Sequence, residues 1–352
     1  MIRYYTRACN FYYGSLSIKL VKTKKTLPIG GSKNISFDQI EIFSRKKNKI
    51  QTKIINIKEI KNLSKEIRKK IISDIKQITS KRIFLNNKSH MLMGILNMTP
   101  DSFSDGGKFN IYSKAFKRIR EMINSGANII DIGGESTRPG SKIIHPKIEW
   151  KRVEKVIKKF KKNFPKTLLS VDTRKSSVME KAIKSKVDII NDVSCFKFDK
   201  KSHKTISNKN LYKIVHHMKG TPQTMQIKPK YNHVLLDIYD FFEREIKKLK
   251  EDKYHKKIIL DPGIGFGKNL KHNLIILSKI SIFHSLGFPI LIGTSRKKFI
   301  NQISKKFDTR ERLGGTLSSV LFSFSQGIQI FRIHNVEEVK QGILVYKTLL
   351  NK

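Results

Sequence analysis

Eight short apolar segments recur after residue 90 of this 352-residue chain, and stretches able to form helices lie between them. The segments are Met91–Met98, Asn128–Gly133, Thr167–Asp172, Asp188–Val193, Tyr212–Met218, Lys257–Asp261, Pro289–Gly293 and Ile328–His334. Uninterrupted apolar strands that alternate with helices indicate a parallel sheet covered by helices. Eight such units over residues 91–352 predict an α/β fold, a (β/α)8 TIM barrel. A doubly wound open sheet is the structural alternative.

Residues 1–90 differ from the rest of the chain. The first acidic residue is Asp38, and several Lys and Arg residues precede it, as is typical of an organellar transit peptide. However, Leu27–Gly31 has the composition of a turn, and Ile40–Ile42 alternates as a strand does. Residues 56–78 carry apolar side chains at helical spacing. We therefore expect a small folded N-terminal extension over residues 1–90, with a cleaved targeting peptide as the alternative.

The chain is strongly basic, with 73 Lys+Arg against 28 Asp+Glu and a formal net charge of +45. Such a charge alone favours a nucleic-acid partner. Because the excess is mainly Lys and is spread along the chain, we expect weak, salt-sensitive attraction to polyanions and no specific nucleic-acid binding. No apolar run is long enough for a membrane helix. Cys9 and Cys195 provide no disulfide framework, which suits a cytoplasmic location.

Polar or glycine-rich clusters follow almost every apolar segment. A barrel brings the carboxyl ends of its strands to one face, where its active site is built. Asn97, Asp172 and Asp261, each at the end of a different segment, should therefore meet there. Closing the barrel sets the last strand beside the first, so Arg332 and His334 are expected near Asn97. Two potential cations beside an amide oxygen predict a site for phosphate and a metal ion.

These segments resemble the signature segments of the dihydropteroate synthase family, in the order of that family. They read MGILNMTPDSFSDGG, IIDIGGESTRPGS, SVDTRK, INDVS, HHMKGTPQTMQ, LDPGIGFGKNLKHN, GTSRKK and IFRIHNVEEV, and they cover residues 91–352 almost without a gap. The resemblance implies condensation of 6-hydroxymethyl-7,8-dihydropterin pyrophosphate with p-aminobenzoate, giving 7,8-dihydropteroate and pyrophosphate in folate biosynthesis. It also implies Mg²⁺ as the metal, sulfonamides as inhibitors and a homodimer as the assembly.

The same resemblance implies roles for individual residues. The predicted substrate-binding residues are Asp172, Asn191, Met218, Asp261 and Lys297 for the pterin, Arg332 and His334 for the pyrophosphate, and Phe266 and Ser295 for the acceptor. Asn97 would be a ligand of Mg²⁺, which prefers oxygen. The predicted catalytic residues, on two loops that close over the reacting groups, are Phe103, Asp105, Thr137, Arg138 and Pro139.

Other interpretations remain open. Asp172, Asn191 and Asp261 could cap the helices that follow them, and His334 could be a buried core histidine. A pterin-dependent methyltransferase on the same barrel would share Asp172 and Asn191, and a basic nucleic-acid-binding protein is the non-enzyme alternative.

Two positions depart from the common family pattern. Asn335 stands where Asp is frequent, although Asn335 and Glu338 can still form a capping arrangement. Lys298 stands where many members have Ser, which affects the expected recognition of p-aminobenzoate and sulfonamides.

Overall fold

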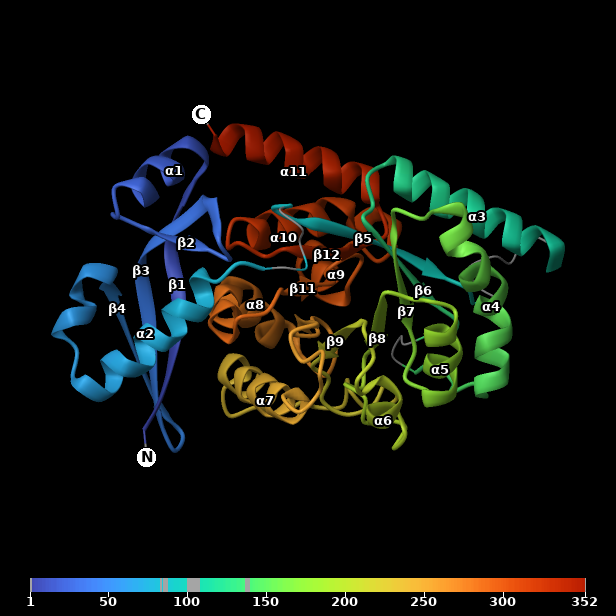
Figure 1. Ribbon diagram of the computed structural model, residues 1–352, viewed down its shortest axis with the longest axis horizontal. Coiled ribbons are helices and arrows are strands. Elements are labelled where there is room, and N and C mark those ends of the chain that lie inside the picture. The colour runs from blue at the N-terminus through green and yellow to red at the C-terminus, as the bar shows by residue number, and fades with distance from the viewer. Residues whose placement is uncertain (1, 83, 85–87, 100–107, 137–139, 352) are drawn as a thin grey trace.

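A computed structural model describes residues 2–82, 84, 88–99, 108–136 and 140–351. Figure 1 shows two regions side by side, an N-terminal antiparallel sheet in blue and a barrel of parallel strands that occupies the rest of the chain. None of the described helices is both long and apolar enough to cross a membrane.

The N-terminal extension is a four-stranded sheet with a helix packed on it. Its strands are β1 (Arg3–Tyr13), β2 (Leu27–Ile29), β3 (Ser32–Lys46) and β4 (Lys49–Asn56), and its helices are α1 (Gly14–Lys22), η1 (Ile57–Asn62) and α2 (Lys65–Thr79). The long strand β3 pairs with all three other strands. Ile71 and Ile78 of α2 are buried against a core that includes Phe37 and Ile40 of β3. This core is separate from the cores of the barrel.

The eight predicted strands are all present, and the predicted barrel is confirmed. They are β5 (Met91–Asn97), β6 (Ile129–Gly133), β7 (Leu168–Asp172), β8 (Ile189–Asp192), β9 (Tyr212–His216), β10 (Ile258–Asp261), β11 (Leu291–Ile292) and β12 (Ile330–Ile333). They form one parallel sheet in the order β10-β9-β8-β7-β6-β5-β12-β11. A parallel bridge between Leu260 and Ile290 joins the two ends of this sheet. The sheet is therefore nearly closed into a cylinder.

Helices follow the strands and cover the outside of the barrel. They are α3 (Lys108–Asn124), α4 (Pro146–Asn163), α5 (Ser176–Lys184), α6 (Ser202–Ile206), α7 (Val234–Leu249), α8 (Leu270–Ser278), η4 (Ile280–Leu286), α9 (Lys298–Ser304), η5 (Arg310–Arg312), α10 (Leu313–Phe324) and α11 (Val336–Leu350). On α4, Trp150, Val153 and Phe160 are buried, so the helical apolar spacing faces the barrel.

Alternation along the strands divides the barrel into an outer core and an interior. Outward side chains such as Ile130, Val171 and Phe331 pack beneath the helices. Inward side chains form an interior apolar layer, which consists of Met91, Met93, Ile129, Ile189, Ile214, Ile259, Leu291 and Ile330 with Phe84. Fully burying one such side chain contributes about 1.5–3 kcal/mol. The layer therefore closes the barrel on the side of the strand beginnings.

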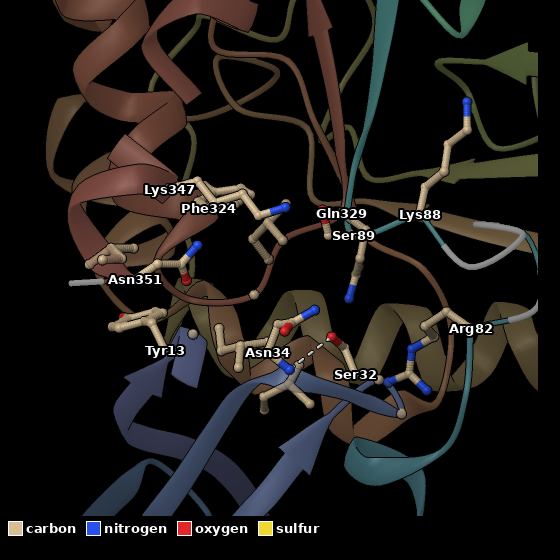
Figure 2. A pocket seen from close by; sticks show the side chains of 18 of the residues that line it. Tyr13, Ser32, Asn34, Arg82, Lys88, Ser89, Phe324, Gln329, Lys347 and Asn351 are labelled. Carbon is tan, nitrogen blue, oxygen red and sulfur yellow. Dashed lines mark hydrogen bonds between the residues drawn. The ribbon is translucent and has the colours of Figure 1, made fainter. Parts of the chain in front are cut away.

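The extension is fastened to the barrel by aromatic and polar contacts. The ring of Tyr5 meets the ring of Tyr239 edge-on at 5.1 Å, and its hydroxyl donates to Asp240 at 2.9 Å. The hydroxyl of Ser281 donates to the carbonyl of Ala8 at 2.8 Å. A cavity of about 210 Å³ lies between the β2–β3 turn, the barrel and the end of α11 (Figure 2).

Candidate active site

Four neighbouring strands place residues at or next to their carboxyl ends in one row. Asn97 pairs with Gly133, Gly133 with Asp172, and Asp172 with Asn191. A Cβ atom on Gly133 would lie 3.5 Å from the Cβ of Asp172 and 3.9 Å from Oδ1 of Asn97. Because Gly133 has no side chain, the space between Asn97 and Asp172 stays open.

Two members of this row, Asp172 and Asn191, belong to a group of polar side chains in the barrel interior. This interior polar cluster consists of Asp131, Ser170, Asp172, Asn191 and Arg332. Arg332 donates from Nε to Asp131 at 2.7 Å and from Nη2 to Asp172 at 2.9 Å. Asp131 also accepts from Ser170 at 2.6 Å and from Asn191 at 3.1 Å. The cluster brings two predicted pterin-binding residues together with Arg332.

The position of Arg332 differs in one respect from the prediction. Strand β12 lies beside β5 as expected, but Arg332 is paired in register with Met93. Its guanidinium is bound by two carboxylates, which the sequence did not reveal. The two carboxylates neutralise it and fix its orientation.

Burial and charge act in opposite directions on the pKa values of this cluster. Burial raises the pKa of Asp172, and the nearby carboxylates of Asp131 and Asp192 raise it further, against the guanidinium of Arg332. Burial lowers the pKa of Arg332, but Asp131 and Asp172 outweigh this effect and raise it overall. Arg332 therefore stays charged, whereas ionised Asp172 lacks full compensation.

Asn191 offers an unused acceptor to the site. Its Nδ2 donates to Asp131, and its Oδ1 is buried with no hydrogen-bond partner among the described residues. A buried polar atom left without a partner costs about 1–3 kcal/mol. A ligand with an N–H donor at this point would remove that cost.

Asp261 lies across the barrel mouth, in register with His216. It accepts from the backbone N–H of Gly263 at 2.8 Å. Burial raises its pKa to about 6, opposed by that hydrogen bond and by the charge of Lys297. None of Asp172, Asn191 and Asp261 forms the N-cap of the helix that follows it, so the capping interpretation does not explain them.

Lys297 and Phe266 form a second wall of the site. Nζ of Lys297 lies 4.0 Å from the centre of the Phe266 ring, and the ring of Phe266 meets the ring of His216 at 4.6 Å. Burial lowers the pKa of Lys297 to about 8, and Arg332 lowers it further, against the two carboxylates of Asp261 and Asp172. Met218 is half-buried just after β9. A flat ring could lie between such a wall and the interior polar cluster.

The glycine-rich segment after β10 is shaped by close backbone contacts. Gly263 and Gly267 have positive φ, and a Cβ on either would lie 2.0 Å or 2.3 Å from a backbone oxygen. Lys268 is buried and donates to the carbonyl oxygen of Phe266 at 2.8 Å. Burial places the pKa of Lys268 well below its usual value. This segment positions Phe266.

Ser295 and His334 form a hydrogen-bonded pair. Oγ of Ser295 lies 2.9 Å from Nδ1 of His334 and also accepts from the backbone N–H of His334 at 3.2 Å. Ser295, which was predicted to bind the acceptor, therefore orients His334.

The expected capping arrangement does not form at the start of α11, because Asn335 donates to the side chain of Glu338 at 2.9 Å and makes no side-chain bond to the helix backbone.

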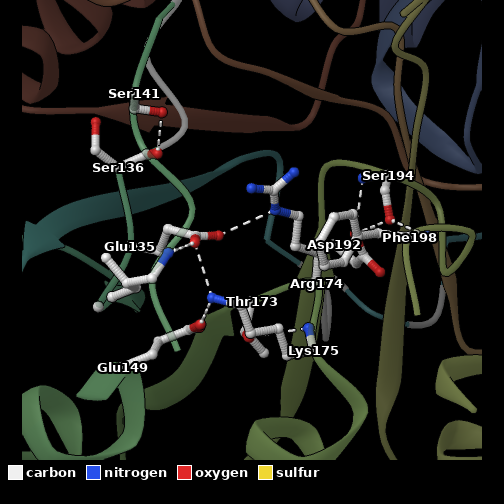
Figure 3. Close-up of polar contacts among 12 residues, drawn as sticks. Glu135, Ser136, Ser141, Glu149, Thr173, Arg174, Lys175, Asp192, Ser194 and Phe198 are labelled. Atoms are coloured by element: carbon white, nitrogen blue, oxygen red, sulfur yellow. Dashed lines mark hydrogen bonds and ion pairs between the residues drawn. The ribbon is translucent and has the colours of Figure 1, made fainter. Parts of the chain in front are cut away.

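A buried ionic network supports the loop after β6 (Figure 3). Glu135 accepts from Nζ of Lys175 at 2.8 Å and from Nε of Arg174 at 3.0 Å. Lys175 also donates to Glu149 of α4 at 2.5 Å. The network ties the start of this loop to β7 and α4.

Several predicted residues cannot be placed. Phe103, Asp105, Thr137, Arg138 and Pro139, the five predicted catalytic residues, lie outside the described residues. Asn97 is half-buried at the end of β5. Among the residues that the structure describes, no group of three or more His, Cys, Asp or Glu side chains could hold a metal ion.

Sequence reasoning missed Asp131 and the network around Glu135. Asp131 had a signal, because it is an acid in the middle of an otherwise apolar strand, and a buried carboxylate needs a partner. Glu135 and Lys175 had no such signal, since each lies in a polar loop segment.

Known proteins resemble this chain closely. A family model described as "Pterin binding enzyme" matches residues 93–334. The dihydropteroate synthase of Escherichia coli (strain K12) is 39% identical over 261 residues, which are 74% of this chain and 92% of that protein. Among solved structures, a Yersinia pestis dihydropteroate synthase in a sulfonamide drug complex is 35% identical with a TM-score of 0.70, covering 75% of this chain and 95% of that one. Dihydropteroate synthase from Thermus thermophilus in complex with 4-aminobenzoate is 32% identical with a TM-score of 0.66, covering 74% and 94%.

Proposed function

This chain belongs to the dihydropteroate synthase family of pterin-binding enzymes, and from that premise we propose that it makes 7,8-dihydropteroate. The amine of p-aminobenzoate attacks the methylene carbon of 6-hydroxymethyl-7,8-dihydropterin pyrophosphate. A C–N bond forms, the C–O bond to pyrophosphate breaks, and the amine loses a proton. No protein nucleophile is needed, so the protein must orient the reactants and stabilise the leaving charge.

The observation that carries this proposal is the buried set of acceptors at the barrel mouth. A pterin presents an amino group and ring N–H groups along one edge. Asp172, the unpaired Oδ1 of Asn191 and Asp261 supply acceptors for such donors. Arg332 holds Asp172 in place, and Asp131 holds both Arg332 and Asn191. The interior polar cluster therefore presents its acceptors in a fixed arrangement before any ligand binds.

Lys297, His334 and Asn97 complete the proposed site. Lys297, already lying over Phe266, contacts the pterin ring, and Met218 lines the apolar wall. His334, oriented by Ser295, contacts the pyrophosphate. The five residues of the two loops, from Phe103 to Pro139, keep their proposed roles in closing over the reacting groups.

We also propose Mg²⁺ as the metal, with Asn97 as its protein ligand. Mg²⁺ is often held by one or two protein oxygens together with substrate phosphates, and the open space that Gly133 leaves beside Oδ1 of Asn97 fits that donor set. When bound, the ion would neutralise charge on the leaving pyrophosphate.

A homodimer in the cytoplasm is part of the same proposal. Large apolar side chains are exposed on α10 and α11, among them Phe322 at 51%, Val345 at 56% and Leu349 at 68%. Exposed apolar patches of this kind often mark contact with another chain. Both cysteines are free and buried, as suits a reducing compartment.

The test is release of pyrophosphate by the full chain with Mg²⁺. Release that requires both the dihydropterin pyrophosphate and p-aminobenzoate is expected. Well-folded protein that releases none, or releases it without p-aminobenzoate, would contradict the proposed reaction. The methyltransferase alternative predicts no release, and the nucleic-acid alternative predicts tight polyanion binding without turnover.

A further inference from the structure

The cavity between the extension and the barrel lies away from the active site. It is bordered by Ser89, before the first residue of β5, and by Gln329, before the first residue of β12. Those residues mark the amino end of the barrel, whereas the proposed pterin site lies at the carboxyl end. The cavity also includes Gly30 and Ile35 of the extension, a region outside the family match at residues 93–334.

The described residues that line this cavity carry positive charge and no negative charge. Lys81, Arg82, Lys88 and Lys347 all contribute, and no Asp or Glu is among the lining residues. Figure 2 shows Lys347 extending from α11 toward the cavity, while Lys88 points away from it. The wall therefore attracts anions at close range.

Arg82 is a buried cation that has no charged partner among the described residues. Its exposed fraction is 3%. Nη1 donates to the carbonyl oxygens of Gln77 and Ser80 and to the hydroxyl of Ser80, and Nη2 donates to the carbonyl oxygen of His284. Nε has no partner among the described residues. No ion pair joins Arg82 to any described carboxylate. Burial lowers its pKa to about 10, so it remains charged at neutral pH.

The contrast with Arg332 shows what is missing at Arg82. Arg332 is met by Asp131 and Asp172, as charged groups inside proteins usually are. Among the described residues, Arg82 is met only by neutral groups, three carbonyl oxygens and the hydroxyl of Ser80. An anion brought by a ligand would supply the opposite charge.

Two glycines pack closely against Arg82 and Lys81. A Cβ on Gly30 would lie 3.2 Å from Cγ of Arg82 and 3.9 Å from its Nε. A Cβ on Gly31 would lie 2.8 Å from Cα of Lys81. Both glycines have positive φ. A larger residue at either position would cover the side chain of Arg82 or displace Lys81.

Apolar side chains also line the cavity, namely Ile29, Ile35, Phe324 and Leu350. We propose that this cavity binds a small phosphate monoester, with its phosphate at Arg82 and Lys81 and its apolar group against Phe324 and Ile35. A phosphate carries up to two negative charges and several strong acceptor oxygens, which match more than one cation. Because the ligand touches both regions, it ties the extension to the barrel.

The experiment uses phenyl phosphate as the probe and the full chain as the protein. Calorimetry should detect binding to the wild type that is at least about tenfold tighter than binding of inorganic phosphate or phenol. Bound probe should also raise the Tm, because it stabilises only the folded state. Failure of the wild type to bind, or equal affinity for inorganic phosphate, would overturn the proposal.

Three variants locate the site. Lys81→Met should weaken phenyl phosphate binding about tenfold. Lys347→Met removes a cation that only extends toward the cavity and should weaken binding less. Lys159→Met is the matched control, because it removes the same charge from the exposed face of α4, at the other end of the molecule (Figure 1). Unchanged affinity in both cavity variants would place the probe elsewhere, including the active site, and would contradict the proposal. An equal loss in Lys159→Met would show that only net charge matters, which would also contradict it.

Discussion

The interior of the barrel is built differently at its two ends. Near the strand beginnings, the interior apolar layer fills the space with Met93, Ile129 and their neighbours, and Phe84 packs against them. Near the strand ends, the barrel interior is filled instead by the interior polar cluster, in which Arg332 binds Asp131 and Asp172. The first arrangement stabilises the fold. The second buries charges and leaves Oδ1 of Asn191 without a partner among the described residues, so its advantage lies in ligand binding.

Removing Arg332, the cation of the interior polar cluster, should have the largest effect, because it should lower both stability and activity. In Arg332→Met, Asp131 and Asp172 lose their shared partner. The free energy of unfolding should fall by about 3–5 kcal/mol, and activity by at least about 100-fold. Urea denaturation and pyrophosphate release measure the two losses. Adding Asp131→Asn should recover part of the stability and none of the activity; a fully stable single variant would contradict the ion pairs.

A substitution in the interior apolar layer should lower stability and leave ligand binding unchanged. Ile214→Ala removes a buried side chain from β9 and should cost about 2–5 kcal/mol of stability. The affinity of the folded protein for pterin should not change, because no acceptor is lost. The same denaturation series and a pterin titration test this. If pterin affinity falls as stability does, the two ends of the barrel interior are not separable in function.

His334, at the edge of the polar end of the barrel, should contribute to binding of the pyrophosphate-bearing ligand and not to binding of the bare pterin. His334→Ala should weaken binding of the dihydropterin pyrophosphate about tenfold and leave binding of bare 6-hydroxymethylpterin unchanged. Ser295→Ala should show the same selectivity with a smaller loss, since Ser295 affects the pyrophosphate through the imidazole that it orients. Titration of each variant with both ligands gives the comparison. Equal losses for the two ligands would mean that His334 serves packing alone.

The change of pterin affinity with pH should be the smallest of these effects, and it tests whether the polar end of the barrel binds pterin through ionised carboxylates. The pKa of Asp261 is raised from 3.8 to about 6, and the ionised form accepts the pterin N–H groups. Affinity should therefore rise with pH through about 6, and further toward 8 because the pKa of Asp172 is raised to about 8. Asp261→Asn should flatten only the lower part of this rise. Stability should change in the opposite sense. The folded state holds the proton more tightly, so the contribution of this group is largest at low pH and declines as pH rises through about 6. A wild-type affinity that is constant from pH 5 to about 7 would exclude this role.

The sequence predicted those features that are visible within a single strand segment. Each barrel strand is an apolar run that ends in a polar cluster, so the strands, their order and the row at the mouth could be anticipated. Even β11, only Leu291–Ile292 in the structure, lies within a predicted segment. In contrast, the partners of Arg332 depend on the stagger between strands far apart in sequence. Asp131 is two residues from the end of β6 and was read as part of an apolar strand.

The same limit applies to the extension. Its strand at Ile40–Ile42 lies within β3, and most of residues 56–78 form α2, with η1 at their start. Nothing in the local pattern indicated that Arg82 would be buried against Gly30 and His284. Contacts of this kind arise from packing between regions, and local propensity contains no information about them.

The most direct test of the central claim, that the polar end of the barrel interior binds pterin, is a calorimetric titration of Asp172→Asn with 6-hydroxymethylpterin. This change keeps the shape of the side chain and removes one acceptor and its charge. Wild type should bind one equivalent, and the variant should bind none in the same concentration range while remaining folded. A variant that binds pterin as tightly as wild type would contradict the account.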